Sequence, residues 1–208
     1  MKNIPKTHLI LLVLVLLTIV WSVVGVVDTY LTWILEAAPA LVGLVILVLT
    51  YRKFRMPTYL YVVMAFHMVI LLVGAHYSYA KVPLGFWMED WFGFTRNNYD
   101  KIGHFMQGVT PALLSIEVLQ RMTPLRTKGW TAFLSVCVAG AFSAFYEIVE
   151  WLAALCSADG TEAFLGTQGY IWDTQSDMLM CFIGAIIAVV VRLKSSPCKT
   201  SGSSQGRN

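Results

Sequence analysis

The chain alternates long apolar stretches with shorter polar segments. Apolar runs that can cross a bilayer as helices are placed at residues 9–27, 33–50, 59–77, 102–119, 130–155 and 178–191. Little of the chain is left over for a soluble module. The pattern therefore predicts an all-α fold, a polytopic membrane helix bundle with about six transmembrane helices, which forms one domain over residues 1–194.

The last residues, 195–208, follow a different pattern, because they are polar and rich in serine and glycine. Such a segment has too few apolar side chains to fold by itself, so it is predicted to be a disordered cytoplasmic tail. Composition agrees with a membrane domain before it: 57% of the 208 residues are hydrophobic and only 13% are charged.

Basic residues fix a predicted orientation. They gather before the first apolar run, between the second and third, between the fourth and fifth, and after the sixth. The connections at residues 28–32 and 156–172 contain no lysine or arginine. The positive-inside rule then places both termini in the cytoplasm. The net charge of +3 arises mostly from this asymmetry and gives no reason to expect nucleic acid as a partner. Membrane lipids are the expected partners, and no protein partner is indicated.

Two acids near the end of the fifth run, Glu147 and Glu150, stand out because that run is otherwise apolar. A charge at the centre of a membrane helix costs about 2.5–3.5 kcal/mol on insertion scales. The two glutamates also lie near the C-terminal end of their helix, where the helix dipole opposes negative charge. A cation, a proton or a metal ion is therefore expected beside them.

Polar side chains on the fourth and sixth helices are predicted to reach the same depth as these glutamates. Asp100, His104 and Gln107 share one face at the start of the fourth helix, and Asp173 and Asp177 share one face at the start of the sixth. In the predicted orientation all of them lie near the periplasmic face. For Asp100 and Asp173 a simpler interpretation is also open, since carboxylates at helix starts cap free backbone N–H groups.

Three interpretations of this cluster remain open. Lys101 or Arg96 could pair with the two glutamates in a structural network. Alternatively, carboxylate and imidazole groups could hold a divalent metal, Zn²⁺ or Mg²⁺/Mn²⁺. The third interpretation is proton-coupled transport through carboxylates and a histidine.

The metal interpretation assigns a role to each candidate residue. The metal ligands would be His104, Glu147, Asp173 and Asp177; the general base would be Glu150 or Asp100; substrate would be bound by Gln107, Lys101 and Gln168. The corresponding function is a metal-assisted hydrolase or transferase that acts on an envelope lipid or a lipid-linked headgroup. The alternative is a protein without chemistry: a small-molecule or proton-coupled transporter, or a membrane scaffold or binding protein.

Other polar residues receive structural interpretations. His67 and His76 are about two and a half helical turns apart and point to opposite faces, so His67 is predicted to pack in the core and His76 to lie at the outer level. Asp28 and Glu36 flank the first outer turn and are interpreted as solvated or headgroup-facing carboxylates.

An aromatic segment lies between the third and fourth runs. Trp87, Trp91 and Phe94 share one helical face, which predicts an amphipathic helix on the outer leaflet, with a lid over the site as the functional alternative.

The polar ends of the last three helices carry motifs that resemble known families. Asp100-Lys-Ile-Gly-His104, Tyr146-Glu147-Ile-Val-Glu150-Trp and Trp172-Asp173-Thr-Gln-Ser-Asp177 together resemble the YjdF-type family of bacterial inner-membrane proteins, whose biochemical function is uncharacterised. This resemblance covers most of residues 1–195 and implies a multi-pass protein of the inner membrane. More remotely, the last three helices resemble the VanZ-like family, which is linked to glycopeptide antibiotic resistance.

Overall fold

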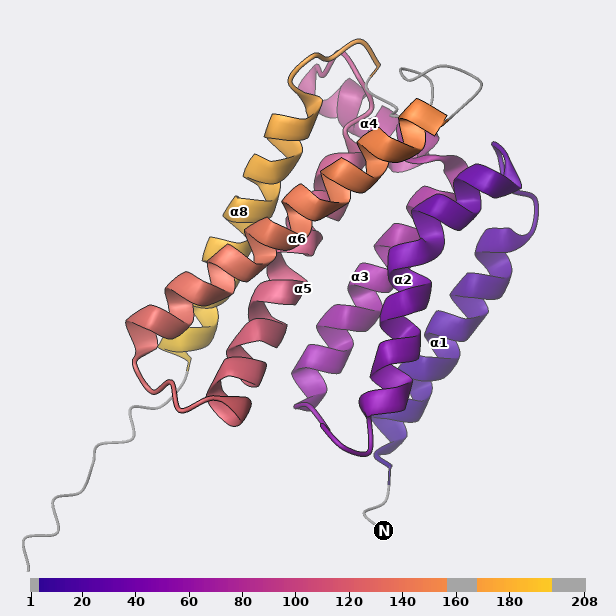
Figure 1. Ribbon diagram of the computed structural model, residues 1–208. Helices are drawn as coiled ribbons and strands as arrows, with labels where there is room; N and C mark the ends of the chain where they lie inside the picture. The colour runs from indigo at the N-terminus through magenta and orange to yellow at the C-terminus, as the bar shows by residue number, and fades with distance from the viewer. Residues whose placement is uncertain (1–3, 157–167, 196–208) are drawn as a thin grey trace, which may run out of the picture.

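The computed structural model describes residues 4–156 and 168–195, and within them the chain is helical and contains no strand (Figure 1). The α-helices are, in chain order, α1 (Lys6–Val23), α2 (Tyr30–Thr50), α3 (Thr58–Tyr77), α4 (Pro83–Phe92), α5 (Tyr99–Met122), α6 (Lys128–Cys156) and α8 (Asp173–Lys194). A single 3₁₀ turn, η1 (Tyr79–Lys81), precedes α4. The all-α fold predicted from the sequence is confirmed.

Within the described residues, five helices are long and apolar enough to cross a membrane: α1, α2, α3, α6 and α8. The central helix α5 has 24 residues, which is sufficient length, but it carries more polar side chains. It packs against α3, α6 and α8, so its polar face is covered by protein. The six apolar runs expected from the sequence thus correspond to six long helices, and the chain is a polytopic helical membrane protein.

The outer surface of the bundle is apolar, as a lipid-facing surface must be. Large side chains such as Leu17 on α1, Leu49 on α2 and Phe145 on α6 are more than half exposed. This surface differs from that of a soluble protein, where so many exposed apolar side chains would cause association.

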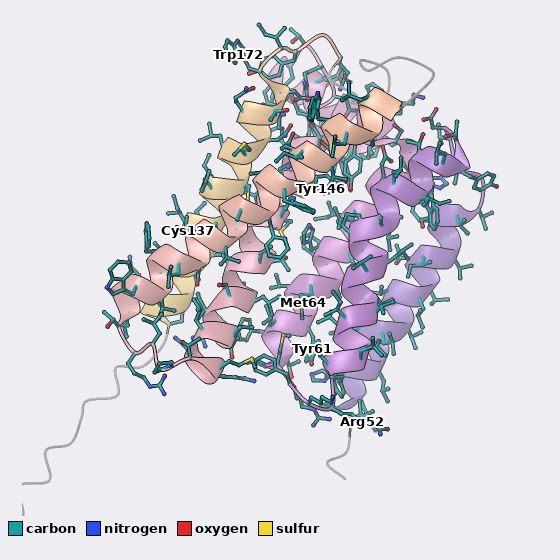
Figure 2. The ribbon with its side chains drawn as sticks, in the orientation of Figure 1. Arg52, Tyr61, Met64, Cys137, Tyr146 and Trp172 are labelled. Carbon is teal, nitrogen blue, oxygen red and sulfur yellow. The ribbon has the colours of Figure 1, made fainter. Side chains whose placement is uncertain are left out.

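The long helices form two groups of three (Figure 1). In the first group α3 packs on both α1 and α2, around Ala37 and Leu72; in the second group α5, α6 and α8 pack on each other. The groups meet along α3 and α5, where Leu60 and Met64 of α3 belong to one buried cluster with Leu113 of α5; Met64 is labelled in Figure 2.

Helices α5 and α8 have the most extensive contact in the molecule, and glycines explain why. A Cβ atom at Gly108 of α5 would lie 1.9 Å from the carbonyl oxygen of Cys181, and one at Gly184 of α8 would lie 2.2 Å from that of Phe105. The backbones can therefore approach closely only because both positions lack a side chain. This contact brings the first turns of α5 and α8 side by side.

The start of α1 and the end of α8 lie at one end of the bundle, together with the α2–α3 and α5–α6 connections (Figure 1). Helix α4 lies at the opposite end. Which of the two ends faces the cytoplasm stays a prediction. Apart from residue 195, the tail predicted for residues 195–208 is outside the described residues.

The aromatic segment forms α4, which begins at Pro83 and ends at Gly93, a residue with a positive φ of 69°. The ring centroids of Trp87 and Trp91 on this helix are 6.4 Å apart, and both side chains are more than half exposed. Gly85 packs on Asn97 so closely that a side chain would not fit there. The predicted helix and the shared face of Trp87 and Trp91 are present, whereas Phe94 lies beyond the end of the helix. Contact of α4 with the outer leaflet stays a prediction.

Candidate site where α5, α6 and α8 meet

An ion-pair network occupies the end of the bundle near α4. The ammonium group of Lys101, in the first turn of α5, donates hydrogen bonds of 2.7 Å to Oδ1 of both Asp173 and Asp177 on α8. Arg96 Nη2 lies 2.6 Å from Oδ2 of Asp100 and 2.8 Å from Oδ1 of Asp173. Two basic side chains thus bridge three aspartates.

Arg96, which precedes α5, stays protonated in this network. Burial alone would lower the pKa of its guanidinium group, but the carboxylates of Asp100 and Asp173 outweigh burial and raise that pKa above the ordinary value. The guanidinium carbon also lies 5.3 Å from the ring centroid of Tyr170, within the range of a cation–π contact.

This network differs from the one expected in two respects. Among the described residues the basic side chains pair with aspartates, whereas the sequence interpretation paired Lys101 or Arg96 with Glu147 and Glu150. The capping interpretation holds only in part: Asn98 and Trp172 are the N-cap residues, and their side chains make no cap hydrogen bond. Both aspartates lie in the first turn of their helix, and Asp100 Oδ1 accepts from the backbone N–H of Lys101 at 2.8 Å. Salt bridges across α5 and α8 therefore determine where these two aspartates point.

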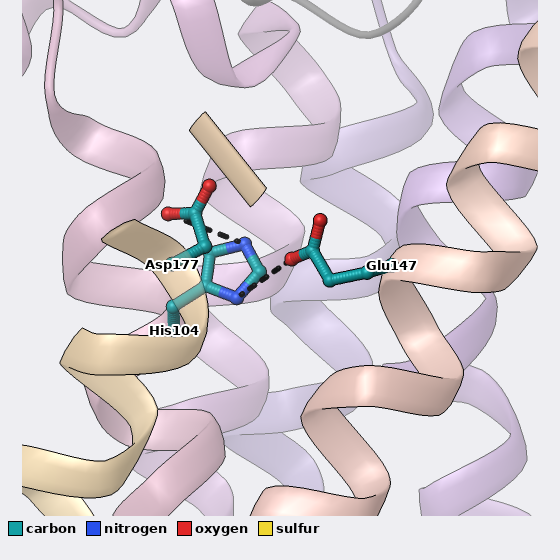
Figure 3. Close-up of side chains that lie close together, drawn as sticks. All are labelled: His104, Glu147 and Asp177. Carbon is teal, nitrogen blue, oxygen red and sulfur yellow. Dashed lines mark ion pairs between the residues drawn. The ribbon is translucent and has the colours of Figure 1, made fainter. Parts of the chain in front are cut away.

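A second cluster lies one turn further into the bundle, where the imidazole ring of His104 sits between two carboxylates (Figure 3). His104 Nδ1 is 3.7 Å from Glu147 Oε1, and His104 Nε2 is 3.7 Å from Asp177 Oδ1. These separations exceed the length of a hydrogen bond. Although His104 and Glu147 are each only 8% exposed, His104 Nδ1 and Glu147 Oε1 have no hydrogen-bond partner among the described residues.

Two groups of residues have donor atoms close enough to hold one metal ion. His104, Glu147 and Asp177 form the first, and Asp100, Asp173 and Asp177 form the second; within each group the donor atoms lie within 4.8 Å of one another. The ammonium group of Lys101 already occupies the second group, because it contacts all three aspartates. The first group is therefore the better candidate. Asp173, which the sequence predicts as a fourth ligand, is instead bound by Arg96 and Lys101.

A cavity of about 160 Å³ opens beside the His104 cluster. It is lined by residues of α2, α3, α5, α6 and α8, so it lies between the two groups of helices. Its acidic lining residues are Glu36, Asp100, Glu147, Glu150, Asp173 and Asp177. The apolar side chains on its wall include Leu35 and Pro39 of α2 and Val149 and Ala153 of α6. The cavity thus combines an acid-rich floor with an apolar wall.

Of the residues predicted to bind substrate, Gln107 lines this cavity and Lys101 belongs to the ion-pair network. Gln168 also lines the cavity, but its side-chain amide is engaged with the backbone of Asn97: Gln168 Oε1 accepts from Asn97 N at 3.0 Å, and Gln168 Nε2 donates to Asn97 O at 3.0 Å. This reciprocal pair joins the segments that precede α5 and α8. The roles of all three residues stay predictions.

The sequence interpretation did not assign several cavity residues to the site, among them Glu36, His67, Tyr79 and Tyr146. The two histidines of α3 have different surroundings, and His76 lies in the last turn of the helix, as expected, whereas His67 belongs to the cavity. His67 lines the cavity, and its Nε2 atom has no hydrogen-bond partner among the described residues. His76 Nδ1 lies 3.1 Å from the carbonyl oxygen of Ser22, and the imidazole ring of His76 packs against the ring of Trp21. The nine-residue spacing of His67 and His76 correctly places them on different faces of α3, but it does not indicate which of these faces meets α5 and α6.

The two tyrosines come from different elements. Tyr146 lies on α6 one turn before Glu150 (Figure 2), and Tyr79 lies on η1 with its ring packed against Gly74. Burial raises the pKa of Tyr79 well above the ordinary value, so its hydroxyl stays protonated. That hydroxyl donates to the carbonyl oxygen of Leu71, at 3.4 Å. In the sequence, both tyrosines look like ordinary aromatic residues at the membrane interface, so nothing marks them as cavity residues.

Comparisons with known proteins agree with this architecture. Residues 7–195 match a family model described as predicted membrane protein (DUF2238). The chain is also 47% identical to the inner membrane protein YjdF of Escherichia coli (strain K12) over 160 residues, which are 77% of each chain. No solved structure matches it. The resemblance to the YjdF-type family is thereby confirmed, whereas these comparisons do not support the more remote resemblance to the VanZ-like family. The chain belongs to the DUF2238 family of predicted membrane proteins.

Proposed function

We propose that this chain is an inner-membrane enzyme, a hydrolase or transferase that uses a divalent cation to act on the headgroup of an envelope lipid. In this proposal His104, Glu147 and Asp177 bind the cation. The observation that carries it is the pair of buried atoms without hydrogen-bond partners, His104 Nδ1 and Glu147 Oε1. Buried polar atoms are nearly always satisfied, so such a pair inside an acid-rich cavity supports a ligand between them.

The spacing of the donor atoms supports a small metal ion. Donors bound to one tetrahedral zinc ion at about 2.0–2.2 Å lie roughly 3.3–3.5 Å from one another. The 3.7 Å between His104 Nδ1 and Glu147 Oε1 is close to that value. The 3.7 Å contact of Asp177 Oδ1 is with the other ring nitrogen, Nε2, and with one donor atom per residue the three donors lie within 4.8 Å of one another. One imidazole nitrogen with two carboxylate oxygens is a donor set that Zn²⁺ and Mn²⁺ accept, and three protein ligands leave a coordination position for water.

Glu150 is the proposed general base. It lines the same cavity and follows Glu147 by one turn of α6, whereas Asp100 is held by Arg96 at 2.6 Å. Cation-bound water would give a proton to Glu150 and attack the phosphorus or carbonyl carbon of the substrate ester. The bond to the leaving alcohol would then break, and the alcohol oxygen would take the proton from Glu150. In a transfer reaction a second alcohol replaces water.

Two features support a lipid as substrate. Leu35 and Val149 on the cavity wall belong to membrane-spanning helices, which provides an apolar surface for acyl chains beside the acid-rich floor. Most of the basic residues lie at the end of the bundle opposite the cavity, whereas only Lys81, Arg96 and Lys101 of the described residues are on the cavity side, and this asymmetry supports cytoplasmic termini and a periplasmic cavity. Gln107, on the cavity wall, is the proposed hydrogen-bonding group for the headgroup.

Elemental analysis of the purified full-length protein, prepared without chelators, tests this proposal. The wild-type protein should hold about one transition-metal ion per chain, and Glu147→Gln and His104→Ala should each lose it, since removal of a ligand weakens such sites strongly. Asp90→Asn is the matched control, because Asp90 is an exposed acid at the same end of the molecule. A wild-type protein without stoichiometric metal would overturn the proposal. With metal present, comparison of lipid extracts from cells that lack or overproduce the protein identifies the substrate.

A second candidate, transport of a small cation, is supported by the position of the cavity between the two helix groups. At the other end of the bundle the groups are joined by Tyr59 of α3, which donates to Glu117 of α5 at 3.0 Å and accepts from Arg192 of α8 at 2.9 Å. An opening at one end and a contact at the other is the geometry required for rocking motions in transporters. A pH-sensitive dye in proteoliposomes tests it, and absence of solute-dependent proton flux would count against proton coupling.

A further inference from the structure

The side of the cavity formed by α2 and α6 contains two acids that the metal group does not use. Glu36 of α2 and Glu150 of α6 both line the cavity, and neither takes part in an ion pair within the described part of the chain. Glu36 Oε1 accepts from the Ser78 hydroxyl at 3.5 Å, but Glu36 Oε2 is buried and has no hydrogen-bond partner there. A buried carboxylate oxygen directed at a cavity requires a donor, and the chain's described residues supply none.

The basic side chains at this end of the molecule are already engaged. Lys101 contacts Asp173 and Asp177, Arg96 contacts Asp100 and Asp173, and Lys81 lies 3.5 Å from Asp28 at an exposed position. None of these three side chains pairs with Glu36 or Glu150, so the cavity offers both acids to a cationic ligand from outside the described chain.

The surroundings of these two acids suit an organic ammonium group better than a second metal ion. The rings of Tyr79 and Tyr146 line the same cavity, together with the apolar side chains of Leu35 and Val149. Aromatic faces attract ammonium groups, and carboxylates accept their N–H donors. A divalent metal would need several further oxygen or nitrogen ligands, which aliphatic side chains cannot give.

We propose that Glu36, Glu150, Tyr79 and Tyr146 form an ammonium subsite, and that the ligand is the amine-bearing headgroup of a phospholipid such as an ethanolamine phospholipid. The assignment of this lipid as the substrate rests on the proposed function, whereas its binding does not. When this lipid is the substrate, Glu36 is the main partner of the ammonium group, and Glu150, the proposed general base, lies between the ammonium group and the cation site. The subsite and the His104 cluster share one cavity, and Glu147 and Glu150 are separated by one helical turn. The amine would bind at the α2 side while the ester group reaches the cation.

A binding experiment with short-chain lipids tests the subsite. The purified full-length protein is titrated in detergent with dihexanoyl phosphatidylethanolamine, with dihexanoyl phosphatidylglycerol and with free ethanolamine. The amine lipid should bind at least about tenfold more tightly than the glycerol lipid, because only the amine can neutralise the two acids. Equal affinity for the two lipids would overturn the subsite. Binding of free ethanolamine as tight as that of the amine lipid would support the subsite and overturn the lipid source.

Variants separate binding from folding. Glu36→Gln should reduce the preference for the amine lipid by about tenfold or more, whereas Asp28→Asn, the control at the neighbouring exposed acid, should keep it. Tyr146→Phe retains the aromatic face and should keep the preference, and Tyr146→Leu should weaken it. An unchanged preference in Glu36→Gln would contradict the inference.

Metal content, measured on the same samples, distinguishes this inference from the proposed function. Glu36→Gln should retain its metal, which also reports that the variant is folded. If the wild-type protein holds no metal but prefers the amine lipid, only the proposed function fails. If it holds metal but shows no amine preference, only the ammonium subsite fails.

Discussion

Gly108 on α5 and Cys181 on α8 lie so close that a Cβ atom added to the glycine would be 1.9 Å from the cysteine carbonyl oxygen. A backbone carbonyl cannot rotate away as a flexible side chain can. The separation of α5 and α8 is therefore set by this contact, and with it the distance between Lys101 and the aspartates of α8.

Gly108→Ala should push α5 and α8 apart. Overpacking of this kind typically costs about 1–3 kcal/mol, so the free energy of unfolding in mixed detergent micelles should fall by that amount. Gly129→Ala is the matched control, because a Cβ atom there meets nothing within 4 Å. Equal stability of the two variants would show that the helices can separate without cost.

Lys101→Met should leave buried carboxylates of Asp173 and Asp177 without their ammonium partner. Removal of one member of a buried ion pair costs about 3–5 kcal/mol, measured as loss of unfolding free energy. Adding Asp173→Asn to Lys101→Met should restore part of that loss, since one uncompensated charge disappears. Lys81→Met, which removes an exposed partner of Asp28, should cost no more than about 1 kcal/mol. A double variant as unstable as Lys101→Met alone would contradict the pairing.

Tyr59→Phe should weaken the contact that joins α3, α5 and α8 at the end opposite the cavity. The hydroxyl group bridges Glu117 and Arg192, and loss of such hydrogen bonds costs about 0.5–1.5 kcal/mol of unfolding free energy. Tyr30→Phe serves as the control because Tyr30 is 63% exposed. The same loss in both variants would mean that the bridge contributes nothing of its own.

The predicted orientation places the end of the bundle near α4 in the periplasm and the opposite end in the cytoplasm. A single cysteine at Asp90, in a background without the natural cysteines, should react with a membrane-impermeant thiol reagent from the periplasm, whereas one at Arg126 should react only after the membrane is opened. Both positions are exposed and lie at opposite ends of the bundle. The reverse labelling pattern would place the cavity on the cytoplasmic side.

The sequence predicts the helices well because their signal is local: an apolar run of sufficient length must span the bilayer. Chain direction then correctly predicts that the polar ends of α5, α6 and α8 share one end of the molecule. The pairing of Lys101 with Asp173 could not be predicted, because it depends on the rotation of α5 and α8 about their axes. That rotation is fixed by the glycine contacts between the two helices, which are long-range in sequence.

The same limit explains the residues that were missed. Glu36 looks like a headgroup-facing acid because it lies within the first two turns of α2, and only the packing of α2 on α3 turns it toward the cavity. His67 and His76 were assigned to separate faces, but the face that meets α5 and α6 is decided by how the two helix groups associate. Periodicity describes one helix, whereas a site formed by five helices depends on their relative placement.

The polar character of α5 has a consequence for how the protein is made. The carboxylates that pair with Lys101 come 72 and 76 residues later in the chain, on α8. When α5 leaves the ribosome, its ammonium group and imidazole therefore have no α8 partner, and a helix with such groups enters lipid poorly by itself. We expect α5 to wait beside the insertion machinery until α8 has been synthesised, so that the second group of helices enters the bilayer as a unit after the first.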